Sequence, residues 1–449
     1  MSDSRYEFTV SSVLKPARWA FLAALVVGLP LGALQAQEQH PFAAAVMQAL
    51  QTNPDVRSSR ASLDSAKEKP VGTTAALRPT ITFTSTATHT ASFYGTTKSK
   101  SDPRAYKLDL SQPIYNKQLF VADEQAMPYV EAAKEDVQNT LQDTILSVAE
   151  VYVGLLEAQE VAALSVNNLK VTSSQLEATR ARFEVGEITR TDVRQGEARV
   201  ASAEAQVKSN QNAVSVSEAK YREVVGMPPP QQMPVPSVED ALMHRDLDQL
   251  IAQAEAHRPD LLAAQERLKV DQLGVNYARA GHYPTLTFSA NGTFTDDAEI
   301  STKTQDSRAY TFVLTAEVPV YEGGGTQSTL RQAKHTLAAS RADLDSQVLQ
   351  IRREVEEALL NYRSALAVVT SYESALAASQ DALNGVEQEF QVGTRTALDL
   401  LDQQNEVFRN QTELAKQRFN VILARFRLLS ATGELTLANL GLTQEVASK

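Results

Sequence analysis

The chain of 449 residues contains no cysteine, so a disulfide framework and a lipid anchor attached through cysteine are both excluded. Basic residues are outnumbered, and the formal net charge is −11. An acidic chain repels nucleic acid, which excludes that class of partner. The six histidines lack the spacing of metal ligands. With no catalytic constellation either, the sequence predicts no enzyme, no metal site and no cofactor.

Long apolar runs are also scarce. One such run covers residues 19–34, behind three basic residues, and Ala36 supplies a small residue for cleavage. This pattern predicts a secretory signal peptide over residues 1–36. A retained membrane anchor is the alternative, but the run is short for a full crossing. No other run is apolar enough for a membrane helix. A search for apolar runs does not detect membrane-spanning strands, because apolar and polar residues alternate along them.

Proline is missing from residues 129–227 and from residues 320–449, which are rich in Ala, Gln, Glu, Ser and Leu. Such stretches can form very long helices. Their apolar residues recur every three or four positions, about 3.5 on average, which is coiled-coil spacing. The recurring residues are Leu141, Ile145, Val148, Tyr152 and Leu155, then Val348, Ile351, Val355, Leu359, Tyr362, Leu366 and Val369. We interpret both stripes as helix-packing seams.

Several segments occur twice. Residues 78–83 return at 283–288, residues 112–115 at 318–321, and residues 182–186 at 389–393. The offset changes only from 205 to 207 residues across these landmarks. A long, nearly constant offset predicts a duplicated structural unit and a molecule with two-fold pseudo-symmetry.

The two repeats are expected to contain the same elements in the same order. The first, over 37–243, contains a helix, strands at about 79–115, a long helix over 116–183, a return helix over 190–226 and an equatorial segment over 227–253. The second, over 244–449, contains a helix over 254–281, strands at about 284–320, a long helix over 325–388, a return helix over 396–432 and a C-terminal segment. The first long helix would measure about 100 Å at about 1.5 Å per residue. The return pieces nearly match it in length, as an antiparallel hairpin requires.

Each repeat carries two segments in which apolar and polar residues alternate, which is the pattern of β-strands. The polar residues 95–103 and 295–307 between them are expected to form loops. Four strands cannot close a membrane barrel, because the smallest single-chain barrels have about eight and lipid does not tolerate open edges. If these strands cross a bilayer, several chains must share one barrel.

This order of elements behind a signal peptide resembles the TolC family of outer-membrane efflux and secretion channels. The most specific stretches are PVYEGGG at 319–325 and FQVGTRTALDLLD at 390–402. The resemblance implies a mainly α fold with a small β portion. A homotrimer would form a twelve-strand transmembrane β-barrel, four strands per chain, continued by a coiled-coil α-helical barrel. The chain would lie in the cell outer membrane with a large periplasmic portion.

The resemblance also implies a function and a set of partners. The protein would be a passive gated exit duct of a tripartite efflux pump or a type I secretion system. Its partners would be a periplasmic adaptor (membrane fusion) protein, an inner-membrane transporter of ABC, RND or MFS type, and outer-membrane lipid. The sequence leaves open the class of transporter and whether the cargo is a drug or a polypeptide.

The candidate site lies at the two helical hairpin tips. Asp192 and Asp399 each follow a threonine by three residues, where an acid completes a capping box, and capping alone could explain both. Asp402 differs, because its counterpart in the first repeat is Gln195, and it shares a helical face with Asp399. The resemblance implies that Asp399 and Asp402 form the periplasmic constriction, as two stacked rings in a trimer.

Arg395 has two possible partners. It could form an i,i+4 pair with Asp399. The resemblance instead implies that it reaches Asp192 on the neighbouring hairpin, near Gln175, and so latches the tip closed. The family usually has tyrosine where this chain has Phe390, and a phenylalanine ring cannot donate the hydrogen bond of that latch. How the closed state is held is therefore left open.

Pro113 and Pro319, together with Gly323, Gly324 and Gly325, are expected at the bends from strand to helix. The glycine run lacks the Lys-Ser/Thr of a phosphate loop, which favours a tight bend. A trimeric coiled-coil surface adhesin or scaffold without transport is the alternative function. It would explain the heptads, but not the duplication or the paired strands. A soluble periplasmic protein is disfavoured because no polar cluster or compact α/β pattern is present.

Overall fold

The structure is a computed structural model that describes residues 41–236, 245–300 and 303–440. These residues form a mainly helical chain with one four-stranded sheet and one short two-stranded sheet. The signal peptide predicted over residues 1–36 lies outside the described residues. None of the helices in the described ranges is both long enough and apolar enough to cross a membrane.

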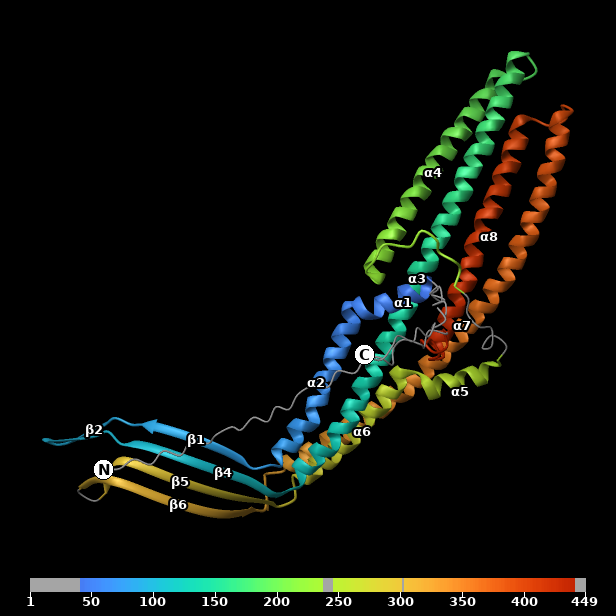
Figure 1. Ribbon diagram of the computed structural model, residues 1–449. Helices are drawn as coiled ribbons and strands as arrows, with labels where there is room; N and C mark the ends of the chain where they lie inside the picture. Colours follow the sequence, from blue (N-terminus) through green and yellow to red (C-terminus); the bar gives the residue numbers. More distant parts are fainter. Residues whose placement is uncertain (1–40, 237–244, 301–302, 441–449) are drawn as a thin grey trace, which may run out of the picture. The chain divides into compact units, whose positions relative to one another are not determined.

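Two very long helices each begin a helical hairpin. Helix α3 (Lys117–Glu184) has 68 residues and helix α7 (Gly325–Gln391) has 67. Helix α4 (Arg190–Val225) returns along α3, and helix α8 (Ala397–Ala431) returns along α7 (Figure 1). Each return helix is about half as long as its partner. Helices α2 (Pro54–Ala76) and α6 (Pro259–Ala280) pack along α3, and α6 also contacts α7.

The shorter helices are divided by prolines. The helix expected over 254–281 is two helices, α5 (Leu247–His257) and α6 (Pro259–Ala280). Arg258 between them has an extended backbone, because the residue before a proline is disfavoured in the helical region. The helix expected before the first strands is likewise divided into α1 (Pro41–Thr52) and α2 (Pro54–Ala76). Asn53 precedes Pro54 and caps α2.

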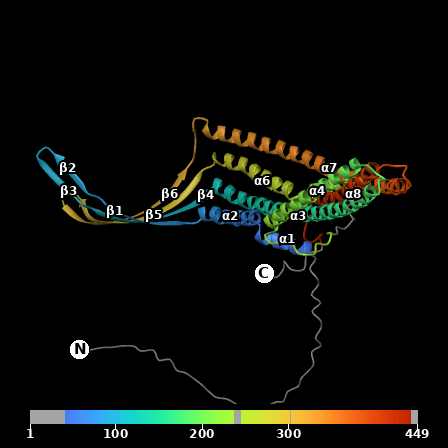
Figure 2. The same ribbon diagram turned by 90° about the horizontal axis from the view of Figure 1, so that it is seen from above.

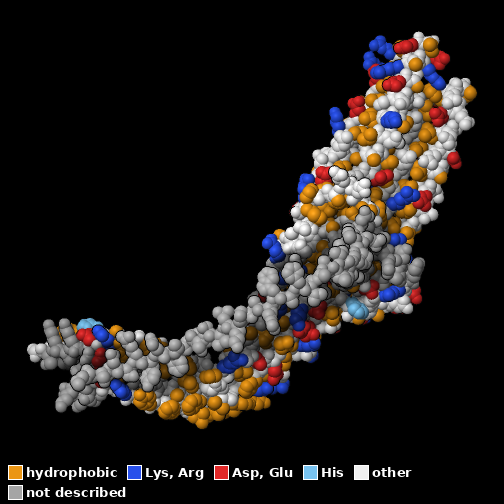
Figure 3. Space-filling model, in the orientation of Figure 1, with side chains coloured by type: hydrophobic (Ala, Val, Ile, Leu, Met, Phe, Trp, Pro, Cys, Tyr) orange, Lys and Arg blue, Asp and Glu red, His pale blue; other side chains and the backbone are white. Residues whose placement is uncertain are grey.

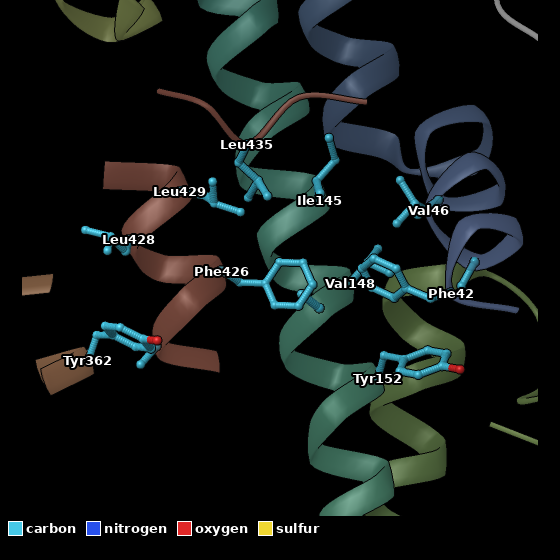
Figure 4. Packing of buried hydrophobic residues seen from close by; sticks show 14 of the residues in the cluster. Phe42, Val46, Ile145, Val148, Tyr152, Tyr362, Phe426, Leu428, Leu429 and Leu435 are labelled. Carbon is cyan, nitrogen blue, oxygen red and sulfur yellow. The ribbon is translucent and has the colours of Figure 1, made fainter. Parts of the chain in front are cut away.

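The main core forms where α1, α3, α7 and α8 meet (Figure 4). The ring centroid of Phe42 lies 5.3 Å from that of Tyr152 and 5.4 Å from that of Phe426. The Tyr152 hydroxyl donates to the carbonyl of Pro234 at 3.0 Å, so the proline-rich segment after α4 packs against this core. Most residues of the predicted seams are buried here: Ile145, Val148, Tyr152 and Leu155 with Ile351, Val355, Leu359 and Tyr362. Leu141, Val348 and Val369 are partly buried against them, whereas Leu366 is exposed.

The four-stranded sheet is antiparallel in the order β1 (Thr80–Ala87), β4 (Arg104–Asn116), β5 (Thr285–Ile300) and β6 (Lys303–Glu317). These strands lie side by side in Figure 1, and Figure 2 shows the same sheet largely edge-on, as a curved layer that continues from the helices. The pairing of β4 with β5 joins the two repeats. Strands β1 and β6 are therefore the edges of the sheet.

The register gives the sheet two different faces. Two rows across the four strands are apolar: Ile81, Leu110, Ala290 and Phe312, then Phe83, Leu108, Gly292 and Tyr310. The row between them is polar: Thr82, Asp109, Asn291 and Thr311. Successive residues of a strand point to opposite faces, so the apolar and polar rows lie on opposite sides. Hydrophobic side chains accordingly line the sheet surface (Figure 3).

The polar segments expected to be loops are largely strand. Residues Thr90–Tyr94 (β2) and Thr97–Ser101 (β3) form a hairpin around Gly95, whose φ is 60°. In the second repeat, β5 and β6 extend into the segment expected to be a loop, to Ile300 and from Lys303. The prediction was wrong because it equated polarity with loops. Threonine is β-branched and favours strands. Strands pair through their backbone groups, so polar side chains do not prevent a segment from forming a strand.

The two bends from strand to helix are built differently. In the first repeat, β4 shifts register between Pro113 and Tyr115, and Asn116 caps α3. In the second, Pro319 follows the end of β6, Gly323 and Gly324 have φ values of 62° and 87°, and Gly325 is the first residue of α7. Left-handed backbone of this kind favours glycine.

Candidate functional site

Both hairpin tips have the same local structure. The hydroxyl of Thr189 accepts from the amide of Asp192, and the hydroxyl of Thr396 accepts from the amide of Asp399. Each aspartate in turn accepts from the backbone amide of its threonine, at 2.9 Å and 3.0 Å. These reciprocal bonds satisfy amide groups that the first turn of a helix leaves unpaired. A capping box is therefore present at the start of both α4 and α8.

The capping box sets the electrostatics of Asp399. The backbone amide of Thr396, then its hydroxyl, and then the charge of Arg395 lower the pKa of the Asp399 carboxyl below its ordinary value of 3.8. Within the chain, these partners favour the ionised carboxylate.

Asp402 makes a contact that the sequence did not predict. Its Oδ1 accepts from Nη2 of Arg199 at 2.5 Å. Arg199 belongs to α4 and Asp402 to α8, so this ion pair joins the two hairpins of one chain. Both side chains are about half exposed, and such pairs contribute about 1 kcal/mol or less. The pair nevertheless places a cation beside one of the two acids assigned to the constriction.

Arg395 binds neither of its two expected partners within the chain. Its Nε donates to Oε2 of Glu389, in the last turn of α7, at 2.8 Å. The i,i+4 pair with Asp399 is absent because Arg395 precedes the cap residue of α8, where helical spacing does not apply. Within the described chain no ion pair joins Arg395 to Asp192. Gln175 lies half-buried on α3.

Phe390 is buried near the tip, with 7% of its surface exposed, and it packs with Ala397 and Leu400. The guanidinium carbon of Arg182, on α3, lies 4.4 Å from the centroid of its ring. A cation at this distance from an aromatic face is attracted by the ring quadrupole. This second contact between the two hairpins involves the ring that lacks the tyrosine hydroxyl. Comparison of the two repeats gave no signal for Arg182, because the matching position in the second repeat is an acid, Glu389.

Charged side chains of both signs gather at the hairpin tips (Figure 3). In the described ranges, no group of His, Asp and Glu side chains is arranged to hold a metal ion. The tips carry salt bridges within and between the two hairpins, together with a helix cap at the start of each return helix.

Comparison with known proteins gives one consistent result. The chain matches the family model described as outer membrane efflux protein over residues 45–227 and 250–434, one stretch in each repeat. It is 28% identical over 442 residues to the outer membrane efflux protein BepC of Brucella suis, which covers 96% of this chain and 93% of the relative. It is 24% identical to the outer membrane protein TolC of Escherichia coli, covering 95% and 89% of the two chains. Its fold matches the outer membrane protein VceC of Vibrio cholerae with a TM-score of 0.75 at 20% identity, covering 87% and 96%.

Proposed function

Because the chain belongs to the outer membrane efflux protein family, we propose that it serves as the outer-membrane exit duct of a tripartite efflux pump or a type I secretion system. In this proposal three copies form one channel. Their twelve strands make a barrel in the outer membrane, and their helical hairpins make a tunnel across the periplasm. The partners are a periplasmic adaptor (membrane fusion) protein, an inner-membrane transporter of ABC, RND or MFS type, and outer-membrane lipid.

The observation that supports this proposal best is the two-faced sheet with open edges. On its apolar face Phe83, Tyr310 and Phe312 are exposed by 66%, 77% and 73%. Such a face is costly in water and suited to lipid. Strands β1 and β6 present unpaired backbone groups at the edges, and lipid requires those groups to be satisfied. Pairing β1 of one chain with β6 of the next satisfies the edges and directs the polar row into an aqueous interior.

The tip residues receive two roles in this proposal. Asp399 and Asp402 form the periplasmic constriction, with their carboxylates on one face of α8. Arg395 exchanges Glu389 for Asp192 on the hairpin of a neighbouring chain and latches the tip, beside Gln175. Both capping bonds of Asp192 use Oδ2, which leaves Oδ1 free to accept from a guanidinium. Arg395 can thus pair with either Glu389 or Asp192. A side chain that can exchange one acidic partner for another suits a reversible latch.

The latch has a direct test. Arg395→Ala should raise the open probability of the channel in planar bilayers about tenfold, because the three exposed latch contacts of the trimer together are worth roughly 1.4 kcal/mol, about 0.5 kcal/mol each. Arg418→Ala is the matched control, since it removes an exposed ion pair to Glu373 within one hairpin. Unchanged gating in Arg395→Ala would confine Arg395 to its local pair with Glu389.

The function itself is tested by two measurements on the same purified protein, native mass spectrometry and electrical recording in planar bilayers. We expect a trimer that gives discrete unitary conductance steps in planar bilayers. A trimer that inserts into the bilayer and conducts no ions would contradict the proposal.

A further inference from the structure

An arginine lies at the border of the apolar face of the sheet. Arg308 on β6 is opposite Phe294 on β5, and Tyr310 is the next residue on the same face. The guanidinium carbon of Arg308 lies 5.5 Å from the centroid of the Phe294 ring. Asp296 and Asp306 occupy this face one row closer to the end of the sheet, and within the described strands neither forms an ion pair with Arg308. Arg308 is therefore the charged residue of this face that lies nearest the apolar rows, and no described carboxylate neutralises it.

A shallow groove lies on the apolar face beside Arg308, and its volume is about 420 Å³. Phe83 on β1 and Tyr310 on β6 stand at its two sides, and Leu108 and Gly292 form its floor between them. Gly292 has no side chain, and the ring of Tyr310 leans toward it, 3.3 Å from where a Cβ would lie. Arg308 also lines the groove. The groove is thus bordered by aromatic rings and has a guanidinium at one end.

The position of Arg308 calls for an anionic partner. A cation on the lipid-facing side of a membrane strand is costly unless it reaches an anion at the interface. Phosphate groups are the anions of a lipid interface, and a guanidinium binds phosphate through parallel hydrogen bonds. The apolar groove beside it suits a hydrocarbon chain. A phosphate and a hydrocarbon chain in one molecule are the chemistry of a phosphorylated lipid.

We infer that Arg308 and the groove beside it bind lipid A, the lipid portion of lipopolysaccharide, with a phosphate on the guanidinium and an acyl chain over Gly292. The choice of lipid A rests on the proposed function, which places the end of the sheet that carries β2 and β3 in the outer leaflet of the outer membrane. Lipopolysaccharide is the lipid of that leaflet. The phosphate monoesters of lipid A also carry more negative charge than the phosphodiester of a glycerophospholipid. Because every residue that lines the groove belongs to one chain, the proposed trimer has three such sites.

Native mass spectrometry of the purified trimer, titrated with lipid A, tests the inference. We expect up to three bound molecules per trimer. Arg308→Gln should raise the dissociation constant about tenfold, because a charge-assisted contact with phosphate is lost. Lys107→Gln is the matched control and should bind as wild type, since Lys107 lies on the polar face and pairs with Asp109. Equal affinity in Arg308→Gln and Lys107→Gln would overturn the inference.

The groove is tested separately from the charge. Gly292→Leu fills the floor of the groove and should also weaken the binding of lipid A. Ala290→Leu adds the same side chain to the same face one row away and outside the groove, so it should bind as wild type. A trimer of Gly292→Leu that conducts ions and binds lipid A with wild-type affinity would show that no acyl chain occupies the groove, and the inference would fail.

Other ligands identify the source of the phosphate. Dephosphorylated lipid A should bind about tenfold more weakly to the wild-type protein and equally to Arg308→Gln. Phosphatidylglycerol should bind more weakly than lipid A, and inorganic phosphate should not displace lipid A. Equal binding of phosphatidylglycerol, or displacement by inorganic phosphate, would overturn the assignment to lipid A.

The inference and the proposed function fail in different ways. A trimer that conducts ions but binds lipid A independently of Arg308 would overturn the inference alone. A protein that binds lipid A through Arg308 and never conducts would contradict the proposed function and still support the lipid site.

Discussion

At the scale of single residues, the acids of the tips have different surroundings. Asp192 and Asp399 complete capping boxes, whereas Asp402 faces Arg199 of the other hairpin. A capping carboxylate is held by its own helix, so it contributes charge without joining elements. Asp402 does join elements, and its field along the proposed channel axis is reduced by the guanidinium beside it.

Ion selectivity should report this pairing. Arg199→Gln removes three guanidinium groups from the proposed constriction, so the cation preference measured from reversal potentials should increase. Asp402→Asn should decrease it, because the guanidinium groups then stay without their acids. Lys208→Gln, on the same helix farther from the tip, is the control for a lost positive charge. Equal and opposite shifts are not required, but shifts of the same sign in both variants would contradict the pairing.

The cap at Asp399 should depend on pH. Because its pKa is lowered in the folded chain, the cap is fully present above 3.8 and is lost as pH falls through the lowered folded value. Hydrogen exchange at the first turn of α8, corrected for intrinsic rates, should stay protected down to pH 3.8. Asp399→Asn should remove this dependence. Loss of protection well above 3.8 would show that repulsion among tip acids outweighs the cap.

At the scale of elements, the bend between β6 and α7 depends on two left-handed glycines. Gly324→Ala forces a side chain into a backbone with a φ of 87° and should destabilise the folded protein by about 1 kcal/mol. Gly325→Ala is the matched control, since Gly325 is helical and its added Cβ would meet nothing within 4 Å. Thermal unfolding followed by circular dichroism measures the difference. Equal melting temperatures for the two variants would contradict this account of the bend.

Sequence reasoning succeeded where periodicity determines structure. Spacing of about 3.5 residues predicted the seam that buries Ile145 and Ile351, and alternation predicted the two faces of the sheet. It failed for contacts between elements far apart in the chain. Arg199 and Asp402 are 203 residues apart, and only the packing of α4 beside α8 brings them together. The partner of Arg395 was missed because the residue lies outside the helix whose spacing was applied to it.

At the scale of the whole molecule, the proposed channel has a defined orientation. Thr96, in the turn between β2 and β3, should face the cell exterior, and Glu187, in the turn between α3 and α4, should face the periplasm. Thr96→Cys should therefore react with a membrane-impermeant thiol reagent on intact cells. Glu187→Cys should react only after the outer membrane is permeabilised. The reverse pattern of labelling would overturn the orientation.

The central claim is that β1 of one chain pairs with β6 of the next and closes the sheet. Disulfide cross-linking between these edge strands in outer membranes tests it most directly. A scan that combines Thr82→Cys in β1 with Cys at successive positions of β6 around Thr311 should contain pairs that yield covalent dimers and trimers. Thr82→Cys with Asp109→Cys, which are cross-strand neighbours within one chain, should leave the mass of a monomer. Efficient formation of monomer-sized β1–β6 disulfides, with no dimer or trimer at any register, would contradict the account.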